Sequence, residues 1–379
     1  MSTNPPATVP RKFDVPAYVI MLVTAALTLL GILILFSVTK HQREPFAMLF
    51  KQCLWLGVAV AAGVAAWKTP LEFLRRQTLW VVVGCVFLLL AVLIPHVGVK
   101  VNGAQRWLGA GQFRMQPSDF VKIGLVLVMA DYLALNVRRM GELVRGVVFP
   151  CIILGLPVVL VFAQPDYGTA ILIAAVGGCL WVLAGGRFRY ILPLAGMGAA
   201  AVGVKLLHNP ERLDRITSFL DIEGNKGEGA YQLYQGVLAL GNGGVAGTGL
   251  GSGVQKFYLP EAHTDFVFTQ VGEELGLVTT LFVVAGFFSL LVFGFLNLRK
   301  APNLYELLLA GGCLLFILLQ ACINLCVVTA LAPTKGMSLP FVSYGGSNLV
   351  VMYMLVGIIL NCFSRWHRAP AMPLKPREL

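Results

Sequence analysis

Residues 16–39 read PAYVIMLVTAALTLLGILILFSVT, a run without a charged side chain. A helix needs about 20 apolar residues to cross the hydrocarbon core of a bilayer, so this run is long enough to span one. Apolar residues follow one another instead of alternating with polar ones, which favours a helix over a strand. A helix also satisfies its own backbone hydrogen bonds, as lipid requires. We therefore predict a membrane-spanning helix here.

The composition of the whole chain also indicates a protein embedded in a membrane. Of the 379 residues, 57% are apolar and 12% are charged, whereas soluble domains carry about 25% charged residues. The polar groups are too few to cover a water-facing surface, so lipid must be the main solvent. The net charge of +11 would suggest nucleic acid for a soluble chain. Here the basic residues cluster between apolar runs, which indicates membrane topology and anionic lipid, with no nucleic-acid partner.

Apolar runs of similar length recur along the chain, and they predict an all-α integral membrane protein with about ten transmembrane helices. The predicted spans are 16–39, 47–67, 78–98, 118–137, 146–164, 168–185, 189–207, 270–298, 304–331 and 346–364. We expect one membrane domain over 16–365, with tails at 1–15 and 366–379. The longest hydrophilic stretch, 208–265, forms a large loop between spans seven and eight.

Lys and Arg residues are distributed unevenly between the two sets of loops. One set is strongly basic, at 11–12, 68–76, 138–145, 187–189, 299–300 and 365–377. The short loops of the other set carry Lys40, Arg43, Lys100, Arg106, Arg114 and Lys335. Because cytoplasmic loops hold the excess of basic residues, we expect a multi-pass protein of the cytoplasmic membrane with both termini in the cytoplasm. The 208–265 loop is then extracytoplasmic.

Two polar stretches on the predicted outer face carry charges that border or enter the spans. Asp119 and Lys122 are three residues apart at the start of the fourth span, close enough to pair, and Arg106 precedes them. The pair is either an interfacial salt bridge or the lining of a polar groove for a charged headgroup. Asp166, in the turn at 164–169, either caps the sixth span or contacts a ligand.

The segment 256–276 concentrates acidic groups at the mouth of the eighth span, and it also holds Lys256 and His263. A carboxylate half-desolvated at the position of Asp265 has a raised pKa and makes a better general base. The alternative is that Asp265 caps the helix. Glu274 lies about two turns deeper, where an unpaired charge is costly, so we expect a cation partner or a wet cavity there.

Two glycine-containing segments complete the predicted outer face. Residues 333–348, PTKGMSLPFVSYGGSN, exclude a continuous helix, and such backbone at membrane depth must pack against protein or line a cavity. Lys335 is positioned there to meet a phosphate. The glycine-rich stretch 241–253 partly matches a nucleotide-binding pattern, which we reject because no strand precedes it. Its backbone N–H groups remain candidates for holding an anionic diphosphate.

Taken together, these stretches closely resemble the FtsW/RodA/SpoVE family, also called the SEDS proteins, over roughly residues 16–365. The most specific parts are LPEAHTDFVF at 259–268, GEELG at 272–276 and PTKGMSLPFVSYGGS at 333–347. The resemblance implies a ten-helix peptidoglycan glycosyltransferase that polymerises lipid II, a disaccharide-pentapeptide on undecaprenyl diphosphate, at the outer leaflet. It also implies a class B penicillin-binding protein as the transpeptidase partner, and membrane proteins of the divisome or elongasome.

The family's essential aspartate maps to Asp265, which becomes the predicted catalytic residue. The predicted substrate-binding residues are Arg106, Asp119, Lys122, Asp166, Lys256, His263, Glu274, Lys335 and Ser343. The Pro-Thr-Lys-Gly form around Lys335 is more like the division members than the elongation members, which often lack this lysine. The family usually has Glu where this chain has Asp119, a departure that bears on the reach of that acid to Lys122.

The resemblance predicts that Asp265 takes a proton from a sugar hydroxyl while basic residues stabilise the departing diphosphate. A divalent cation is a candidate assistant, although the sequence offers no clear ligand set. Three alternatives remain open. They are an elongation-type polymerase, a lipid II flippase or other transporter with broken helices and buried charges, and a non-catalytic scaffold that docks a partner enzyme through the 208–265 loop.

Overall fold

The computed structural model describes residues 14–40, 45–101, 104–110, 113–208, 210–227 and 229–366. Within these ranges, ten helices match the ten predicted spans. They are α1 (Val15–Thr39), α2 (Pro45–Lys68), α4 (Thr78–Leu93), α5 (Pro117–Asn136), α6 (Phe149–Ala163), α7 (Tyr167–Leu183), α8 (Phe188–Leu207), α11 (Val267–Leu298), α12 (Leu304–Val328) and α13 (Gly346–Trp366). Most of them are long and apolar enough to cross a membrane, while α4 and α7 are shorter apolar helices. The chain is an integral membrane protein.

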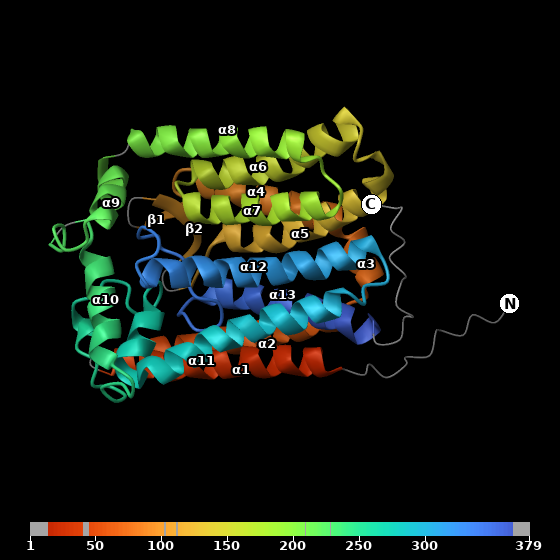
Figure 1. Ribbon diagram of the computed structural model, residues 1–379. Helices are drawn as coiled ribbons and strands as arrows, with labels where there is room; N and C mark the ends of the chain where they lie inside the picture. The colour runs from red at the N-terminus through yellow and green to blue at the C-terminus, as the bar shows by residue number, and fades with distance from the viewer. Residues whose placement is uncertain are drawn as a thin grey trace.

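The ten helices lie side by side in one bundle with their axes along a common direction (Figure 1). The short helix α3 (Leu71–Arg76) lies at one end, which we call the α3 end. The strands, α9 (Pro210–Leu220) and α10 (Tyr231–Gly243) lie at the opposite end, which we call the strand end. The polar insertions therefore gather at one end of the apolar bundle.

The centre of the bundle is α13, most of whose apolar span is buried against its neighbours. It packs along α2, and glycines permit the close approach. A Cβ atom at Gly357 would overlap the backbone oxygen of Gly63, and one at Gly63 would lie 2.8 Å from the backbone oxygen of Tyr353. Small residues at helix contacts are typical of membrane bundles, where packing replaces the hydrophobic effect as the driving force.

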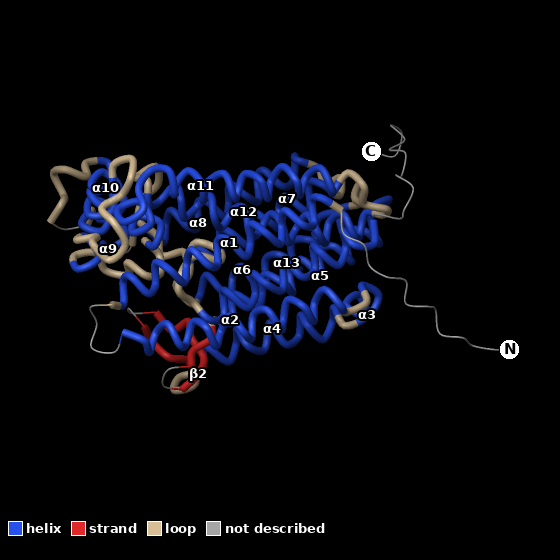
Figure 2. The backbone as a smooth tube through the Cα atoms, turned by 90° about the horizontal axis from the view of Figure 1, so that it is seen from below, coloured by secondary structure: helices blue, strands red, loops and turns tan. Residues whose placement is uncertain are grey.

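The loop before α5 differs from the prediction, because it forms a small antiparallel sheet of β1 (Gly98–Val101), β2 (Ala104–Ala110) and β3 (Phe113–Met115). The third span was predicted to reach residue 98, but α4 ends at Leu93. Ile94 comes next and is followed by Pro95, and a helix rarely continues into the residue before a proline. The side-chain amide of Gln105 then donates to the carbonyls of Val92 and Ile94, at 2.9 and 3.0 Å. Figure 2 shows the strands beside α2 and α4.

The glycine-rich stretch closes a break in α11. Gly276 has φ +77° and interrupts the helix. The amides of Thr248 and Gly249 donate to the carbonyls of Glu273 and Glu274, at 2.9 and 3.0 Å, and the amide of Leu277 donates to Gly244. Carbonyls that a broken helix leaves without partners are satisfied in this way. This segment thus supports α11. The amides of Thr248 and Gly249 bind helix carbonyls, so they are not the amides that would hold a diphosphate.

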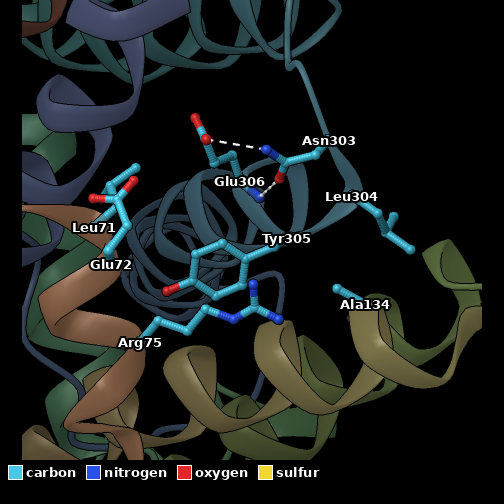
Figure 3. Close-up of a pocket in the computed structure, with 8 residues that line it drawn as sticks. All are labelled: Leu71, Glu72, Arg75, Ala134, Asn303, Leu304, Tyr305 and Glu306. Carbon is cyan, nitrogen blue, oxygen red and sulfur yellow. Dashed lines mark hydrogen bonds between the residues drawn. The ribbon is translucent and has the colours of Figure 1, made fainter.

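Both ends of the described chain lie at the α3 end. The carboxylate of Asp14 pairs with Lys300 at 2.8 Å, and Arg365 makes two hydrogen bonds to Glu72 of α3. A pocket of about 290 Å³ opens here, lined by Leu71, Glu72, Arg75, Ala134, Asn303, Leu304, Tyr305 and Glu306 (Figure 3). The predicted tails, apart from the residues nearest the bundle, lie outside the described residues at 1–13 and 367–379.

Candidate active site

Asp265 lies in the tight turn that leads into α11. The amides of Thr264 and Phe266 both donate to the carbonyl of Glu261, at 3.1 and 3.4 Å. Glu261 adopts φ +57°, a left-handed conformation that is uncommon for a residue with a side chain. The N-cap of α11 is Phe266, and no side chain caps the helix. Asp265 is therefore not the helix cap, and its carboxylate is not used to cap α11.

The surroundings of Asp265 favour its protonated form. Burial, followed by the charge of Glu261, raises the pKa of this carboxyl to about 7; Asp166 adds to the rise and Arg106 opposes it. A general base is most effective when its pKa lies near the working pH. This rise has the direction expected from partial desolvation, and it suits proton transfer near neutral pH.

Arg106 and Asp166 face each other beside Asp265. Arg106 comes from β2, and its Nη1 lies 4.0 Å from Oδ1 of Asp166. Asp166 is also the N-cap of α7, where its Oδ1 accepts a hydrogen bond from the amide of Thr169. Its Oδ2 accepts a bond of 2.8 Å from the side-chain amide of Gln116. The capping role expected of Asp166 is confirmed, and the same carboxylate holds Arg106 near the site.

Lys335 reaches the same place from the loop between α12 and α13. A Cβ atom added at Gly168, the second residue of α7, would overlap Cε of Lys335. A Cβ atom at Gly336, the next residue along the loop, would lie 2.6 Å from Oδ2 of Asp265. The loop thus places one cation against the start of α7 and its glycine against the carboxylate. The charge of Arg106 acts on the carboxyl of Asp265, while Lys335 lies against the start of α7, next to the loop residue that meets this carboxylate.

The expected pair of Asp119 and Lys122 forms deeper in the bundle, with 2.9 Å between Nζ and Oδ1. Both residues are buried. Lys122 also donates to the amide oxygens of Gln320 and Asn348, and Ser347 donates to the second oxygen of Asp119 at 2.7 Å. The shorter acid therefore reaches Lys122. The pair is the centre of a polar cluster that joins α5, α12 and α13.

Lys256 and Glu274 pair at a different place, where the glycine-rich segment meets α1 and α11. Their Nζ and Oε1 atoms are 3.0 Å apart, and both side chains are buried. Lys256 also donates to the carbonyl of Gly251, and Ser37 of α1 donates to Glu274. The expected cation partner of Glu274 is thus Lys256. These contacts hold the segment onto the bundle, and the structure does not bring this pair to Asp265.

Ser343 and His263 join the loop of Lys335 to the turn of Asp265. Ser343 Oγ accepts a bond from the amide of Leu339 and donates to the carbonyl of Thr264 at 2.5 Å. The amide of Tyr344 donates to the carbonyl of His263 at 3.0 Å. Burial lowers the pKa of the His263 imidazole, and the charge of Glu261 opposes this. His263 also lines a cavity of about 270 Å³ together with Val38, Lys256, Phe257, Leu259, Glu261 and Ala262.

Several residues that organise the site were not predicted. Gln320 and Asn324 are uncharged amides inside the predicted span 304–331, four positions apart on one helix face. Both are buried and both bind the loop that carries Lys335. A pair of amides spaced by one turn in an apolar run is a sequence signal that could have identified them.

In the described part of the chain, no group of three or more His, Cys, Asp or Glu side chains could hold a metal ion.

Known proteins are similar to this chain in sequence. A protein of Legionella pneumophila named "Probable peptidoglycan glycosyltransferase FtsW" is 36% identical over 343 residues, 89% of this chain and 87% of that one. A protein of the same name from Allochromatium vinosum is 37% identical over 325 residues, 84% of this chain and 81% of that one.

Solved structures agree at the level of the fold. A chain in the structure of a peptidoglycan synthase complex has a TM-score of 0.77 at 23% identity, covering 94% of this chain and 99% of that one. The rod shape determining protein RodA of Thermus thermophilus gives a TM-score of 0.70 at 24% identity, covering 94% of this chain and 98% of that one. The family model FtsW/RodA/SpoVE, described as "Cell cycle protein", matches residues 17–367. With motifs, fold and relatives in agreement, the chain belongs to the FtsW/RodA/SpoVE family.

Proposed function

We propose that this protein is a peptidoglycan glycosyltransferase that polymerises lipid II at the outer leaflet of the cytoplasmic membrane. The observation that carries the proposal is the position of Asp265. Its carboxyl, with a pKa of about 7, lies at the strand end of an apolar bundle, under the charge of Arg106 and against Gly336 of the loop that carries Lys335. The relatives named as glycosyltransferases support the same activity.

The proposed reaction uses these groups as follows. Asp265 accepts the proton of the 4-hydroxyl of GlcNAc on one lipid-linked sugar. The oxygen attacks the anomeric carbon of MurNAc on the growing chain, the bond to undecaprenyl diphosphate breaks, and the configuration inverts. General base catalysis of this kind contributes about 10²–10⁴-fold. Arg106 and Lys335 stabilise the charge that develops on the leaving diphosphate.

The bundle explains why such an enzyme is embedded in a membrane. Substrate and product both stay attached to lipid tails, so the reacting sugars can be reached only at the interface. The site lies at the end of helices whose outward faces carry large apolar side chains. The tails then lie against these faces while the sugars meet Asp265 in water.

The proposal includes an orientation and a cellular role. Both ends of the described chain lie at the α3 end, and the excess of basic residues in the loops at that end supports placing it in the cytoplasm. The 208–265 loop and Asp265 are then extracytoplasmic. The lysine of the Pro-Thr-Lys-Gly sequence and the FtsW relatives support septal wall synthesis beside a class B penicillin-binding protein.

Polymerisation of lipid II by the purified protein, with and without its transpeptidase partner, tests the proposal. We expect Asp265→Asn to abolish glycan formation. Asp131→Asn is the matched control, because Asp131 is a carboxylate paired with Arg75 at the α3 end. Unchanged polymerisation by Asp265→Asn would remove this residue from the mechanism. Transport of lipid II across vesicles without glycan formation by the wild type would favour the flippase.

A further inference from the structure

Asn324 of α12 lies between the catalytic turn and the loop that carries Lys335. Its side-chain Nδ2 donates two hydrogen bonds, one of 2.8 Å to the carbonyl of Asp265 and one of 2.6 Å to the carbonyl of Met337. The residue is 1% exposed. One amide group therefore connects three segments, the turn, the loop and the helix.

We propose that Asn324 is a positioning residue, whose amide holds the carboxylate of Asp265 against the loop of Lys335 and Gly336. This inference rests on the proposed function. Met337 follows Gly336 directly, and Gly336 is the residue whose added Cβ would lie 2.6 Å from Oδ2 of Asp265. A bond to the carbonyl of Met337 thus fixes the part of the loop that covers the carboxylate.

The geometry of α12 supports this assignment along a full turn. Gln320, four residues before Asn324, donates from Nε2 to the carbonyl of Ser338 at 2.9 Å and accepts a bond from Lys122. The loop is therefore attached to α12 at Met337 and at Ser338. Asn324 is the member of this pair that also holds the backbone of Asp265.

The oxygen of the Asn324 side chain bears on why an amide stands at this position. Oδ1 of Asn324 is buried and has no hydrogen-bond partner among the described residues. A buried polar atom without a partner lowers the stability of the folded protein. If this position only had to be filled, a leucine of similar size would do so without that cost. The two donated bonds are the feature that an apolar residue cannot supply.

The positioning role has a consequence for the proton affinity of Asp265. The charges that act on its carboxyl are Glu261 of the same turn, Arg106 of β2 and Asp166 at the start of α7. His263 belongs to the same turn, and Lys335 precedes Gly336, the loop residue that meets the carboxylate. Burial is the largest cause of the raised pKa. If the loop and turn separate, water reaches the carboxyl and its pKa falls toward the ordinary value.

The test uses the full-length protein and a control with the same chemistry. Asn361 of α13 is fully buried and donates from Nδ2 to the carbonyls of Ala66 and Thr69, at 3.0 and 2.5 Å. It belongs to the interface of α2 and α13, away from the turn of Asp265. Asn324→Ala and Asn361→Ala each remove two donated bonds, so their costs in thermal stability should be similar.

Two measurements separate positioning from stability. The first is kcat for lipid II polymerisation, which we expect to fall by about 10²-fold in Asn324→Ala, since small misplacements have effects of that size. The second is labelling of Asp265 by a hydrophobic carbodiimide, which reacts with the protonated carboxyl, followed by mass spectrometry across pH. We expect its midpoint to move down by about one pH unit in Asn324→Ala and to stay in place in Asn361→Ala.

Asn324→Ser keeps one hydrogen-bond donor and replaces the alanine variant in the test if that variant does not fold. Its changes in kcat and in the labelling midpoint should be intermediate. Equal labelling midpoints in the wild type and the Asn324 variants, or an unchanged kcat, would overturn the positioning role. A wild-type protein that does not polymerise lipid II would contradict the proposed function instead. The labelling experiment would still report whether Asn324 controls the environment of Asp265.

Discussion

Lys256 and Glu274 form an ion pair of 3.0 Å whose side chains are 1% and 0% exposed. Removing one partner of a buried pair leaves an uncompensated charge and costs about 3–5 kcal/mol. We therefore expect Lys256→Met to lower the thermal stability of the purified protein strongly. Replacing Glu274 by Gln in the same chain should restore much of the loss, because the stranded charge is then absent.

The control for this pair is Lys300→Met. Lys300 pairs with Asp14 at 2.8 Å, but its side chain is 46% exposed. Pairs exposed to solvent contribute up to about 1 kcal/mol, so this variant should melt close to the wild type. Equal losses of stability in the two lysine variants would contradict the assignment of Lys256 as a buried clamp.

The polymerisation rate should depend on pH through Asp265. A base must be deprotonated to accept a proton, and this carboxyl has a pKa of about 7. We expect kcat to rise with pH through that value and to level off above it. Initial rates of lipid II polymerisation between pH 5 and about 9 measure this. A profile that is flat across neutral pH would exclude Asp265 as the titrating base.

The same carboxyl makes a prediction about stability. The folded protein binds a proton at Asp265 more tightly than the unfolded chain does, because the folded pKa is raised from 3.8 to about 7. Stability contributed by this group is therefore present below pH 3.8 and is lost as pH rises through about 7. Asp265→Asn lacks this loss. It should melt higher than the wild type at pH 8, and the difference should shrink toward acidic pH.

The position of Lys335 can be tested through the glycine it packs against. Alanine at Gly168 would overlap Cε of Lys335, the flexible part of that side chain. We expect Gly168→Ala to displace the cation and lower kcat with little effect on folding. Gly178→Ala is the matched control in α7, because a Cβ atom there meets nothing within 4 Å. Equal rates in the two variants would mean that Lys335 does not act on the substrate.

The sequence predicted the ten spans because apolar periodicity is a local property. Residues 16–39, for instance, correspond to α1 with a start one residue earlier, at Val15. The sheet at 98–115 was not predicted, and the third span was extended to residue 98 across Pro95. The hydrogen bond from Gln105 to the carbonyl of Val92, at the end of α4, forms only because β2 folds back against α4, and no local sequence pattern predicts that fold-back.

The candidate site divides in the same way. Asp119 and Lys122 are three residues apart, so their pairing followed from helix geometry. The neighbours of Asp265 come from distant parts of the chain, and motifs alone do not give their distances. Lys256 and Glu274 shared a segment with Asp265 in the sequence, yet they form a separate clamp. Nearness along the chain was a poor guide where loops fold back on helices.

The close contact of α2 with α13 should control assembly of the bundle. A Cβ atom at Gly357 would overlap the backbone oxygen of Gly63, which cannot move without shifting the whole helix. We therefore expect Gly357→Ala to lower both thermal stability and the yield of folded protein. Gly57→Ala lies on the same helix as Gly63 but meets nothing within 4 Å, so it should gain helix propensity of about 1 kcal/mol and melt no lower than the wild type. If Gly357→Ala melted like the wild type, the two helices would have to pack less closely than this contact requires.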